Sequence, residues 1–286
     1  MPGTAAKLRK LLEAEGMVVA PFVFDALTVK MAECIGFEAL YMTGSGTAAS
    51  LGMPDVGLAT MTEVVNNIRY IAASTDVPLI ADADTAYGNP VNVQRTIREY
   101  ERAGAAALHM EDQVFPKKCG YLEEKEVIPP EENVQKIRAA LDARPDPDFV
   151  FIARTDALSV SGWGDTIRRA LAYRDAGADL VFVDGIRNRE DLQVYVDNLV
   201  RKGIPCLYNG WLVPAPEAEK LGIKVNITGG LHRLAYPLLR ERLHELKQTG
   251  KCDYESQITG IDFLSLADLL GLPDIHDVER RYSVGT

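Results

Sequence analysis

The alternation that decides the fold is seen in AGAAALHME (residues 103–111), where an Ala-Gly pair typical of a helix end leads directly into a short apolar run. Glycine stands at the same place before other apolar runs, within residues 35–37, 176–178, 202–204 and 221–223. Most of the runs are apolar on both faces, as expected of parallel strands that helices cover. This repeated order of helix, glycine and strand is the pattern of βαβ units.

About eight β-rich runs are found, at residues 17–24, 39–43, 78–84, 106–111, 149–156, 180–184, 205–209 and 224–228. Eight units over about 210 residues favour a closed (β/α)₈ barrel over an open doubly wound sheet. The length of 286 residues and the hydrophobic content of 47% suffice for one such barrel. We therefore predict a single α/β domain over residues 1–286, with a TIM-type barrel at about 17–235 and extra helices at about 236–286.

Two amphipathic helices are expected beyond the last strand, at residues 238–247 and 261–270, followed by a short acidic and basic tail at 274–281. These helices have no further strand to follow. Apolar helices appended to a barrel commonly cover its base or pack on a neighbouring subunit. The sequence therefore predicts an oligomer.

The overall charge restricts the partners. The formal net charge is −10, so nucleic acid and anionic membranes are repelled and neither is expected as a partner. An acidic substrate would have to be captured by local cations or a metal ion. The four cysteines are far apart and the first ten residues lack the apolar run of a signal peptide, so we expect a reducing cytoplasm. No apolar run reaches the roughly 20 residues that span a bilayer.

The strongest chemical signal is ADADTAYG (residues 81–88) at the end of an expected strand. Alternate residues of a strand share a face, so Asp82 and Asp84 are expected together at the carboxyl-terminal mouth, where barrel active sites lie. Paired carboxylates suit Mg²⁺, with Mn²⁺ as an alternative. The competing interpretation is a capped strand end that leads into the helix beginning near Pro90.

Two further strand ends carry polar groups. His109 could donate to a substrate oxygen and Glu111 could hold a metal-bound water, although a single histidine is often only a structural group. Arg154 presents a planar fork that binds a carboxylate in two places. It could equally form an ion pair with a neighbouring aspartate.

FPKKCGY (residues 115–121) is expected to be a mobile lid. Lys117 and Lys118 would favour the thiolate of Cys119, which could then exchange a proton near neutral pH. YMTGSG (residues 41–46) resembles a turn that offers backbone N–H groups to an anion, and a substrate carboxylate is a better candidate than a dinucleotide. Asp55 lies in a turn where aspartate is common for local reasons.

Taken together, these motifs resemble the isocitrate lyase and phosphoenolpyruvate mutase superfamily, most closely its methylisocitrate lyase, dimethylmalate lyase and carboxyphosphonate mutase-like branch. The most specific are DADT (82–85), HMEDQ (109–113), KKCG (117–120) and ARTDA (153–157). The resemblance implies a (β/α)₈ barrel, often tetrameric, with a helix exchanged between subunits.

The resemblance also implies a set of site residues. Mg²⁺ would be bound by Asp82 and Asp84, with Asp55 and Glu111 assisting through water. The 2-oxo acid half of the substrate would be held by Tyr41, Thr43, Gly44, Ser45 and Arg154. Cys119, with Lys117 beside it, would protonate the carbanion of the departing acid while Mg²⁺ polarises the C2 oxygen.

Three positions depart from the family pattern. Tyr121 stands where a histidine usually follows Cys119-Gly120, and Asp184 replaces a glutamate after the sixth strand. After the seventh strand the chain has Asn209-Gly210-Trp211, so we expect a different or smaller distal substituent than in methylcitrate-type substrates.

Three functions remain open. The first is a carbon–carbon lyase acting on a 2-hydroxy di- or tricarboxylate of the 2-methylisocitrate or dimethylmalate type. The second is an oxaloacetate decarboxylase or hydrolase, or a carboxyphosphonoenolpyruvate-type phosphonate mutase, on the same scaffold. The third is a catalytically silent barrel that serves as a binding protein.

Overall fold

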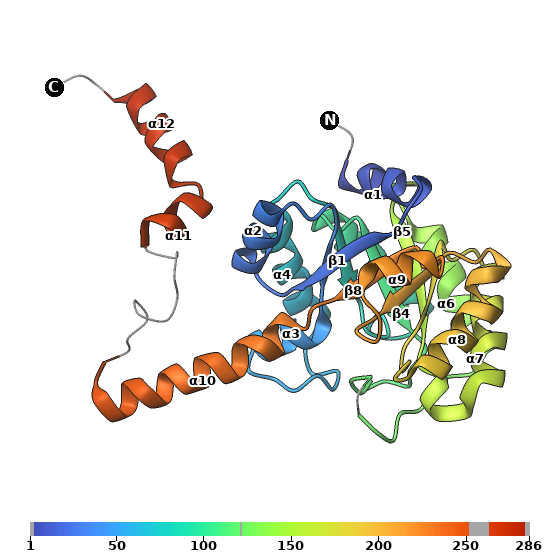
Figure 1. Cartoon of the computed structure of the whole chain (residues 1–286). Helices are drawn as coiled ribbons and strands as arrows, with labels where there is room; N and C mark the ends of the chain where they lie inside the picture. Colours follow the sequence, from blue (N-terminus) through green and yellow to red (C-terminus); the bar gives the residue numbers. More distant parts are fainter. Residues whose placement is uncertain (1–2, 121, 252–262, 284–286) are drawn as a thin grey trace.

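The computed structural model describes residues 3–120, 122–251 and 263–283. Eight parallel strands close into a barrel in chain order, from β1 to β8. Figure 1 shows strands at the centre with helices around them. The strands are β1 (Val18–Val23), β2 (Leu40–Met42), β3 (Leu79–Asp82), β4 (Ala107–Glu111), β5 (Val150–Thr155), β6 (Leu180–Val183), β7 (Cys206–Asn209) and β8 (Val225–Thr228). The predicted (β/α)₈ barrel is confirmed.

Helices surround this barrel, and local capping explains where several of them begin and end. The helices up to the last strand are α1 (Thr4–Glu13), α2 (Ala26–Ile35), α3 (Gly44–Ser50), α4 (Met61–Ala72), α5 (Pro90–Arg102), α6 (Pro130–Ala143), α7 (Leu158–Asp175), α8 (Arg189–Asn198) and α9 (Ala215–Lys220), with a 3₁₀ turn at Val200–Lys202. Asp25 begins α2 by accepting a 2.7 Å hydrogen bond from the Thr28 N–H. Gly36 ends it with φ 97°, the left-handed conformation that the glycine pattern predicts.

Strand alternation sorts the side chains of the barrel. Leu108 and Met110 of β4 pack outward against the helices, whereas Ala107 packs inward with Ile152 and Phe182. The same alternation turns the side chains at the carboxyl ends of the strands inward, and the register pairs Asp82 with His109 and Glu111 with Arg154. The polar residues are therefore collected at the mouth of the barrel.

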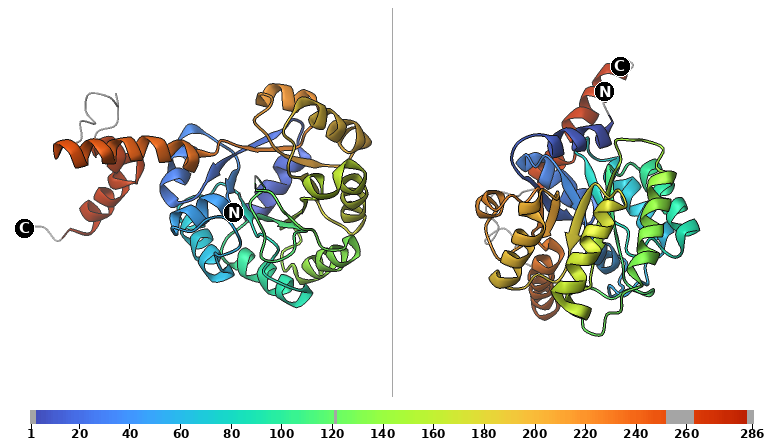
Figure 2. Two further views of the ribbon diagram at one scale, coloured as in Figure 1. Left: turned by 90° about the horizontal axis from the view of Figure 1, so that it is seen from below. Right: turned by 90° about the vertical axis from the view of Figure 1, so that its right-hand side faces the viewer.

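A helical arm follows the last strand. Helix α10 (Leu231–Thr249) extends away from the barrel, and α11 (Phe263–Leu269) and α12 (Leu272–Tyr282) lie on the same side (Figures 1 and 2). The helix expected at 238–247 lies within α10, and the one expected at 261–270 corresponds to α11, although residues 261 and 262 lie outside the described residues. Among the described helices, none has the length and apolarity needed to cross a membrane.

The short acidic and basic tail expected at 274–281 forms a helix, α12, within the region expected to carry the extra helices. Its acidic Asp274 lies in the first turn and its basic Arg280 and Arg281 lie in the last. This arrangement of charge complements the helix dipole. The acidic and basic residues of this tail are thus placed where they favour a helix.

Candidate active site

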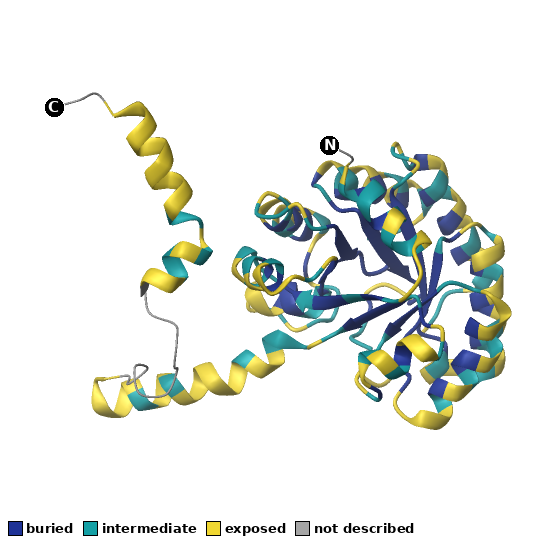
Figure 3. Ribbon diagram, turned by 45° about the horizontal axis from the view of Figure 1, so that its top comes forward, coloured by how far each residue is buried: buried dark blue, intermediate teal, exposed yellow. Residues whose placement is uncertain are grey.

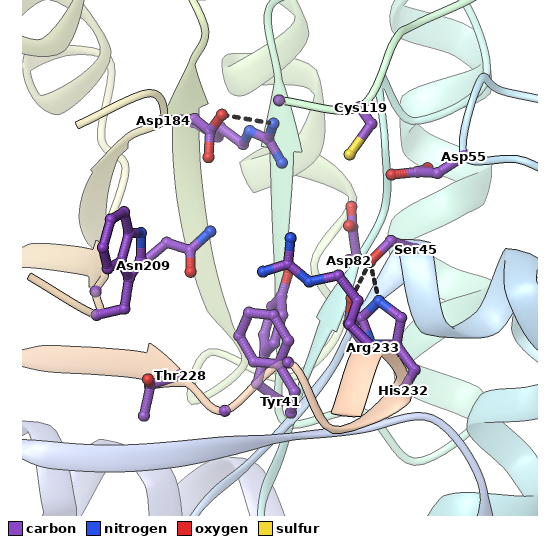
Figure 4. A pocket seen from close by; sticks show the side chains of 18 of the residues that line it. Tyr41, Ser45, Asp55, Asp82, Cys119, Asp184, Asn209, Thr228, His232 and Arg233 are labelled. Carbon is purple, nitrogen blue, oxygen red and sulfur yellow. Dashed lines mark hydrogen bonds and ion pairs between the residues drawn. The ribbon is translucent and has the colours of Figure 1, made fainter. Parts of the chain in front are cut away.

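A cavity of about 460 Å³ opens at the carboxyl ends of the strands. It is lined by eleven of the residues that the sequence singled out: Tyr41, Thr43, Ser45, Asp55, Asp82, Lys117, Cys119, Arg154, Asp184, Asn209 and Trp211. Figure 4 shows Cys119 and Asp55 on one side of the cavity, with Asp184 and Asn209 across from them. The remaining candidates, Gly44, Asp84, His109 and Glu111, are not among the lining residues.

Asp82 and Asp84 come together through a turn and not through strand alternation. Strand β3 ends at Asp82, and Asp84 has a left-handed φ of 47°. The Asp84 N–H donates to Asp82 Oδ1 at 3.0 Å, and the Gly44 N–H donates to Asp82 Oδ2 at 3.1 Å. The expectation that both aspartates lie on one strand face was wrong, because the strand stops before the second one.

Lys117, in the segment 115–121 that was expected to be a lid and is called the flap below, supplies the positive charge next to these aspartates. Lys117 Nζ lies 2.9 Å from Asp84 Oδ1 and also pairs with Asp55 Oδ1. Burial, together with the charges of Asp82 and Asp55, raises the pKa of Asp84 to about 6 in spite of Lys117. Burial also raises the pKa of Asp82, but His109, Lys117 and Arg154 outweigh it and lower that pKa to about 2.

Arg154 is held by carboxylates on several sides. Its Nε and Nη2 donate to the two carboxylate oxygens of Asp156 at 2.9 and 3.1 Å. Its Nη1 lies 3.0 Å from Glu111 Oε2 and its Nη2 lies 3.5 Å from Asp184 Oδ2. The ion pairs expected as the alternative role of this arginine are therefore formed, and its guanidinium also lines the cavity.

His109 lies behind the cavity wall. Its Nε2 is 2.8 Å from the Tyr41 hydroxyl and 3.6 Å from Asp82 Oδ1, and the side chain is fully buried. Burial lowers the pKa of His109 to about 4, so the ring is neutral at pH 7. This placement differs from the expected direct contact with a substrate oxygen, because Tyr41 stands between His109 and the cavity. The histidine orients Tyr41 instead.

The expected lid is packed down over the site. The Cys119 N–H donates to the Asp55 carbonyl at 3.0 Å, and the Gln113 side chain exchanges two hydrogen bonds with the Lys118 backbone. A Cβ on Gly120 would lie 2.0 Å from Asp184 Oδ2, so a larger residue here would require the Asp184 carboxylate to move. Tyr121 lies outside the described residues.

The two lysines beside Cys119 have other partners. Lys117 contacts Asp55 and Asp84, and Lys118 donates to the Glu124 carbonyl at 2.7 Å. The proposed effect of both lysines on the Cys119 thiol therefore has to compete with these contacts.

Sequence reasoning missed the first turn of α10. His232 and Arg233 line the cavity, and His232 Nε2 lies 3.2 Å from Ser45 Oγ, which is in turn 2.9 Å from Thr43 Oγ1. The Gly229-Gly230 pair after the last strand is the signal that could have located them, because loops that follow barrel strands build the active site.

The residues present suit a hard divalent cation. In the parts of the chain that the structure describes, no three carboxylate, imidazole or thiol groups form a ready-made metal cage. Mg²⁺ does not need one, since it takes one or two carboxylates plus waters and substrate oxygens. Both Glu111 carboxylate oxygens are buried without a hydrogen bond, although one forms the ion pair with Arg154. They could accept hydrogen bonds from metal-bound water, and Asp55, Asp82 and Asp84 offer further carboxylate oxygens.

Comparisons with known proteins agree with this geometry. The family model described as phosphoenolpyruvate phosphomutase matches residues 8–247. The 2,3-dimethylmalate lyase of Eubacterium barkeri is 42% identical over 292 residues, which cover 99% of each chain.

Solved structures of related enzymes have the same fold. Oxaloacetate acetylhydrolase in complex with 3,3-difluorooxalacetate has a TM-score of 0.90 at 38% identity, over 98% of this chain and 97% of the other. A phosphonopyruvate hydrolase complex with oxalate and Mg²⁺ has a TM-score of 0.85 at 31% identity, over 98% and 99%. The prediction of an enzyme related to carbon–carbon lyases is thereby confirmed. The chain belongs to the phosphoenolpyruvate mutase and isocitrate lyase superfamily.

Proposed function

We propose that the protein is a Mg²⁺-dependent carbon–carbon lyase that cleaves a small 2-hydroxy di- or tricarboxylate of the dimethylmalate type into a 2-oxo acid and a second carboxylic acid. The observation that carries this proposal is the convergence of the Asp82 carboxylate, the Arg154 guanidinium and the Cys119 thiol on one cavity. The relation to 2,3-dimethylmalate lyase over the full chain supports it.

The cation would be held by Asp82 and Asp84, with Asp55 and Glu111 acting through water. When bound, Mg²⁺ would polarise the C2 oxygen of the substrate and offset the negative charge that develops on it. The solved relative with oxalate and Mg²⁺ supports a cation of this class.

The chain's own residues would bind and orient the substrate. Arg154, Thr43 and Ser45 line the cavity and would hold the carboxylate next to C2, together with the turn at Gly44. Asp156 fixes the Arg154 fork through two hydrogen bonds, so little orientation freedom would be lost on binding. Tyr41, positioned by His109, would contact the same half of the substrate.

The reaction breaks the bond between C2 and C3. The C2 hydroxyl would lose its proton to water in the cavity, a carbonyl would form at C2, and the electron pair of the broken bond would pass to C3 of the departing acid. Cys119 would donate its thiol proton to that carbon, and Lys117 would supply positive charge at the same end of the cavity. On the distal side, Asp184, Asn209 and Trp211 would contact the substituents on C3.

Hydrolysis or decarboxylation of oxaloacetate is the second candidate, because the oxaloacetate acetylhydrolase structure is so similar. A phosphonate mutase reaction and a silent binding protein are the remaining alternatives. The proposed arrangement of cavity groups favours catalysis over a silent barrel, since nothing in packing requires a thiol, an arginine and two aspartates at one mouth.

The deciding experiment incubates the protein and Mg²⁺ with a panel of 2-hydroxy and 2-oxo acids and identifies the products by mass spectrometry. Cys119→Ser should lower turnover by about 10²- to 10⁴-fold while retaining 2-oxo acid binding in calorimetry. Cys34→Ser, on the exposed face of α2, is the matched control. Full activity of Cys119→Ser would contradict the lyase mechanism. Pyruvate and CO₂ from oxaloacetate, without cleavage of any 2-hydroxy acid, would favour the decarboxylase.

Assembly is a further part of the proposal. Leu238, Leu239 and Leu243 of α10 are each more than 60% exposed, and Figure 3 shows the arm as largely exposed. We propose that residues 1–286 form one domain whose arm is exchanged between subunits of a homotetramer. A cytoplasmic location stays a prediction.

A further inference from the structure

The turn that carries Asp84 has an unusual backbone. Asp84, Ala86 and Tyr87 have φ values of 47°, 57° and 59°. Side chains other than glycine rarely adopt this left-handed conformation, and it persists only where surrounding contacts enforce it. In the described parts of the chain, Glu124 is the only other residue besides glycine with a positive φ. Strain is therefore concentrated next to the proposed cation site.

Helix α5 supports one side of this turn. The Tyr100 hydroxyl donates to the Asp82 carbonyl at 3.0 Å, and the Tyr87 hydroxyl lies 2.8 Å from the Tyr100 oxygen. Since the single hydroxyl hydrogen of Tyr100 is directed at Asp82, Tyr87 is the donor of the second bond. Thr96 Oγ1 lies 3.2 Å from the Ala86 carbonyl and 3.0 Å from the Asn92 carbonyl, so its one hydroxyl hydrogen is shared between these two acceptors. The Ala86 N–H donates to the Ala83 carbonyl at 2.8 Å, so in the peptide between residues 85 and 86 only the Thr85 carbonyl still needs a partner.

That partner comes from α6, the next helix around the barrel. Lys136 Nζ donates to the Thr85 carbonyl at 2.7 Å across 51 residues of sequence. The lysine is only 3% exposed and does not line the cavity. The Thr85 hydroxyl is buried without a hydrogen bond within the described structure, so the carbonyl provides the polar anchor of this residue.

Burying a lysine to bond a backbone carbonyl has a cost. Removing an ammonium group from water is unfavourable unless its hydrogen bonds and nearby charges compensate. Burial lowers the pKa of Lys136, and the carboxylates of Glu132, Asp112 and Glu111 act in the opposite direction. A hydrogen bond from a charged donor is stronger than a neutral one, which suits a turn that must be kept strained.

We propose that Lys136 is a positioning residue, which holds the Thr85 carbonyl so that Asp84 stays left-handed and presents its carboxylate to the divalent cation. The part of this inference that concerns the cation rests on the proposed function. Lys136 acts only through the turn and touches no reacting atom.

The test compares Lys136→Met with the wild-type chain in the absence of substrate. Mn²⁺ binding is followed by electron paramagnetic resonance, and hydrogen exchange is followed at the backbone amides of residues 83–88. Loss of a partner that orients a metal ligand typically weakens metal affinity by about 10- to 100-fold. We expect that loss in Lys136→Met, together with faster exchange in the turn.

Lys224→Met is the matched control. Lys224 also donates to backbone carbonyls, those of Ala14 and Gly16 at 2.5 and 3.0 Å, but at the amino-terminal end of β8 and not at the mouth. Its loss should leave both Mn²⁺ affinity and exchange in the turn unchanged. Equal losses in the two lysine variants would overturn the inference, since they would reflect general destabilisation.

The outcomes separate this inference from the proposed function. If the wild-type chain binds Mn²⁺ and Lys136→Met binds it equally well, the inference is overturned and the cation site stands. If the wild-type chain binds no Mn²⁺, the cation site fails, and exchange alone decides whether Lys136 holds the turn. Lys136→Gln, which is too short to reach the carbonyl, is judged by the same criteria should Lys136→Met not fold.

Discussion

Replacing Arg154 by methionine should destabilise the folded chain strongly, because its guanidinium balances three buried carboxylates. Asp156 receives two of its hydrogen bonds, and Glu111 and Asp184 lie within 3.0 and 3.5 Å of it. Removing one partner from a buried charge cluster costs about 3–5 kcal/mol. At about 2–4 °C per kcal/mol for a chain of this size, the expected fall in Tm is roughly 6–20 °C.

The penalty should grow with pH. Burial raises the pKa of Glu111 and of Asp184, and Arg154 opposes both shifts. Without the arginine these pKa values rise further, so the folded variant retains protons that the unfolded chain has already lost. A carboxyl group whose pKa is higher in the folded chain than in the unfolded chain lowers the stability of the fold as pH increases. The Tm deficit of Arg154→Met should therefore be larger near about pH 8 than near about pH 5.

Thermal unfolding followed by circular dichroism, with a chelator present, measures this deficit. Arg168→Met is the control, since Arg168 is 58% exposed in its ion pairs with Asp165 and Glu131 and should shift Tm little. Arg154→Lys retains the charge without the fork and should fall between the two. A deficit that shrinks as pH rises, or one no larger than that of the control, would refute the electrostatic argument.

Three other predictions concern regions outside the cavity. Burial raises the pKa of Asp165, but hydrogen bonds from two arginines and a serine outweigh it and lower the pKa to about 2. The ionised carboxylate therefore stabilises the fold above the pKa of the unfolded chain, and this contribution disappears as pH falls through the pKa of the folded chain. The difference in urea midpoint between the wild-type chain and Asp165→Asn should thus become smaller as pH is lowered from about 5 to about 3. A midpoint difference that stays constant over this range would contradict the prediction. Burial raises the pKa of Cys206 to about 12, so iodoacetamide should alkylate Cys34 in the folded protein and reach Cys206 only after unfolding, as peptide mass spectrometry would show. Charging the arm with Leu239→Glu and Leu243→Glu should reduce the particle mass in light scattering, and an unchanged mass would exclude this surface as the interface.

The parts of the fold that repeat could be predicted from the sequence. Glycine at the helix ends and apolar runs gave all eight strands, because both signals are local and recur in every βαβ unit. Alternation along β4 and β5 also placed Glu111 and Arg154 on the inner side, where the two side chains form an ion pair. It failed at Asp84, where the strand had already ended in a left-handed turn.

Features that depend on tertiary contacts could not be predicted. The burial of His109 behind Tyr41 depends on packing across the barrel, and the strand pattern does not record it. His232 and Arg233 join the site because the barrel closes between β8 and β1, which brings the first turn of α10 next to Ser45. Lys136 reads as an ordinary helix lysine until the fold places the Thr85 carbonyl beside it.

The charges at the mouth link the flap to the proposed cation site. Lys117 pairs with Asp55 and Asp84, and both are among the carboxylates proposed for the cation, directly or through water. The Lys117 ammonium group alone cannot balance the carboxylates of Asp55, Asp82 and Asp84. This imbalance is part of the reason that the pKa of Asp84 is raised to about 6. A divalent ion held by Asp84 would share this carboxylate with Lys117 and would repel the ammonium group. Cys119 follows two residues later on the same flap, and its N–H is bonded to the Asp55 carbonyl. Cation binding and the position of the proposed acid would therefore be coupled through a segment of only three residues.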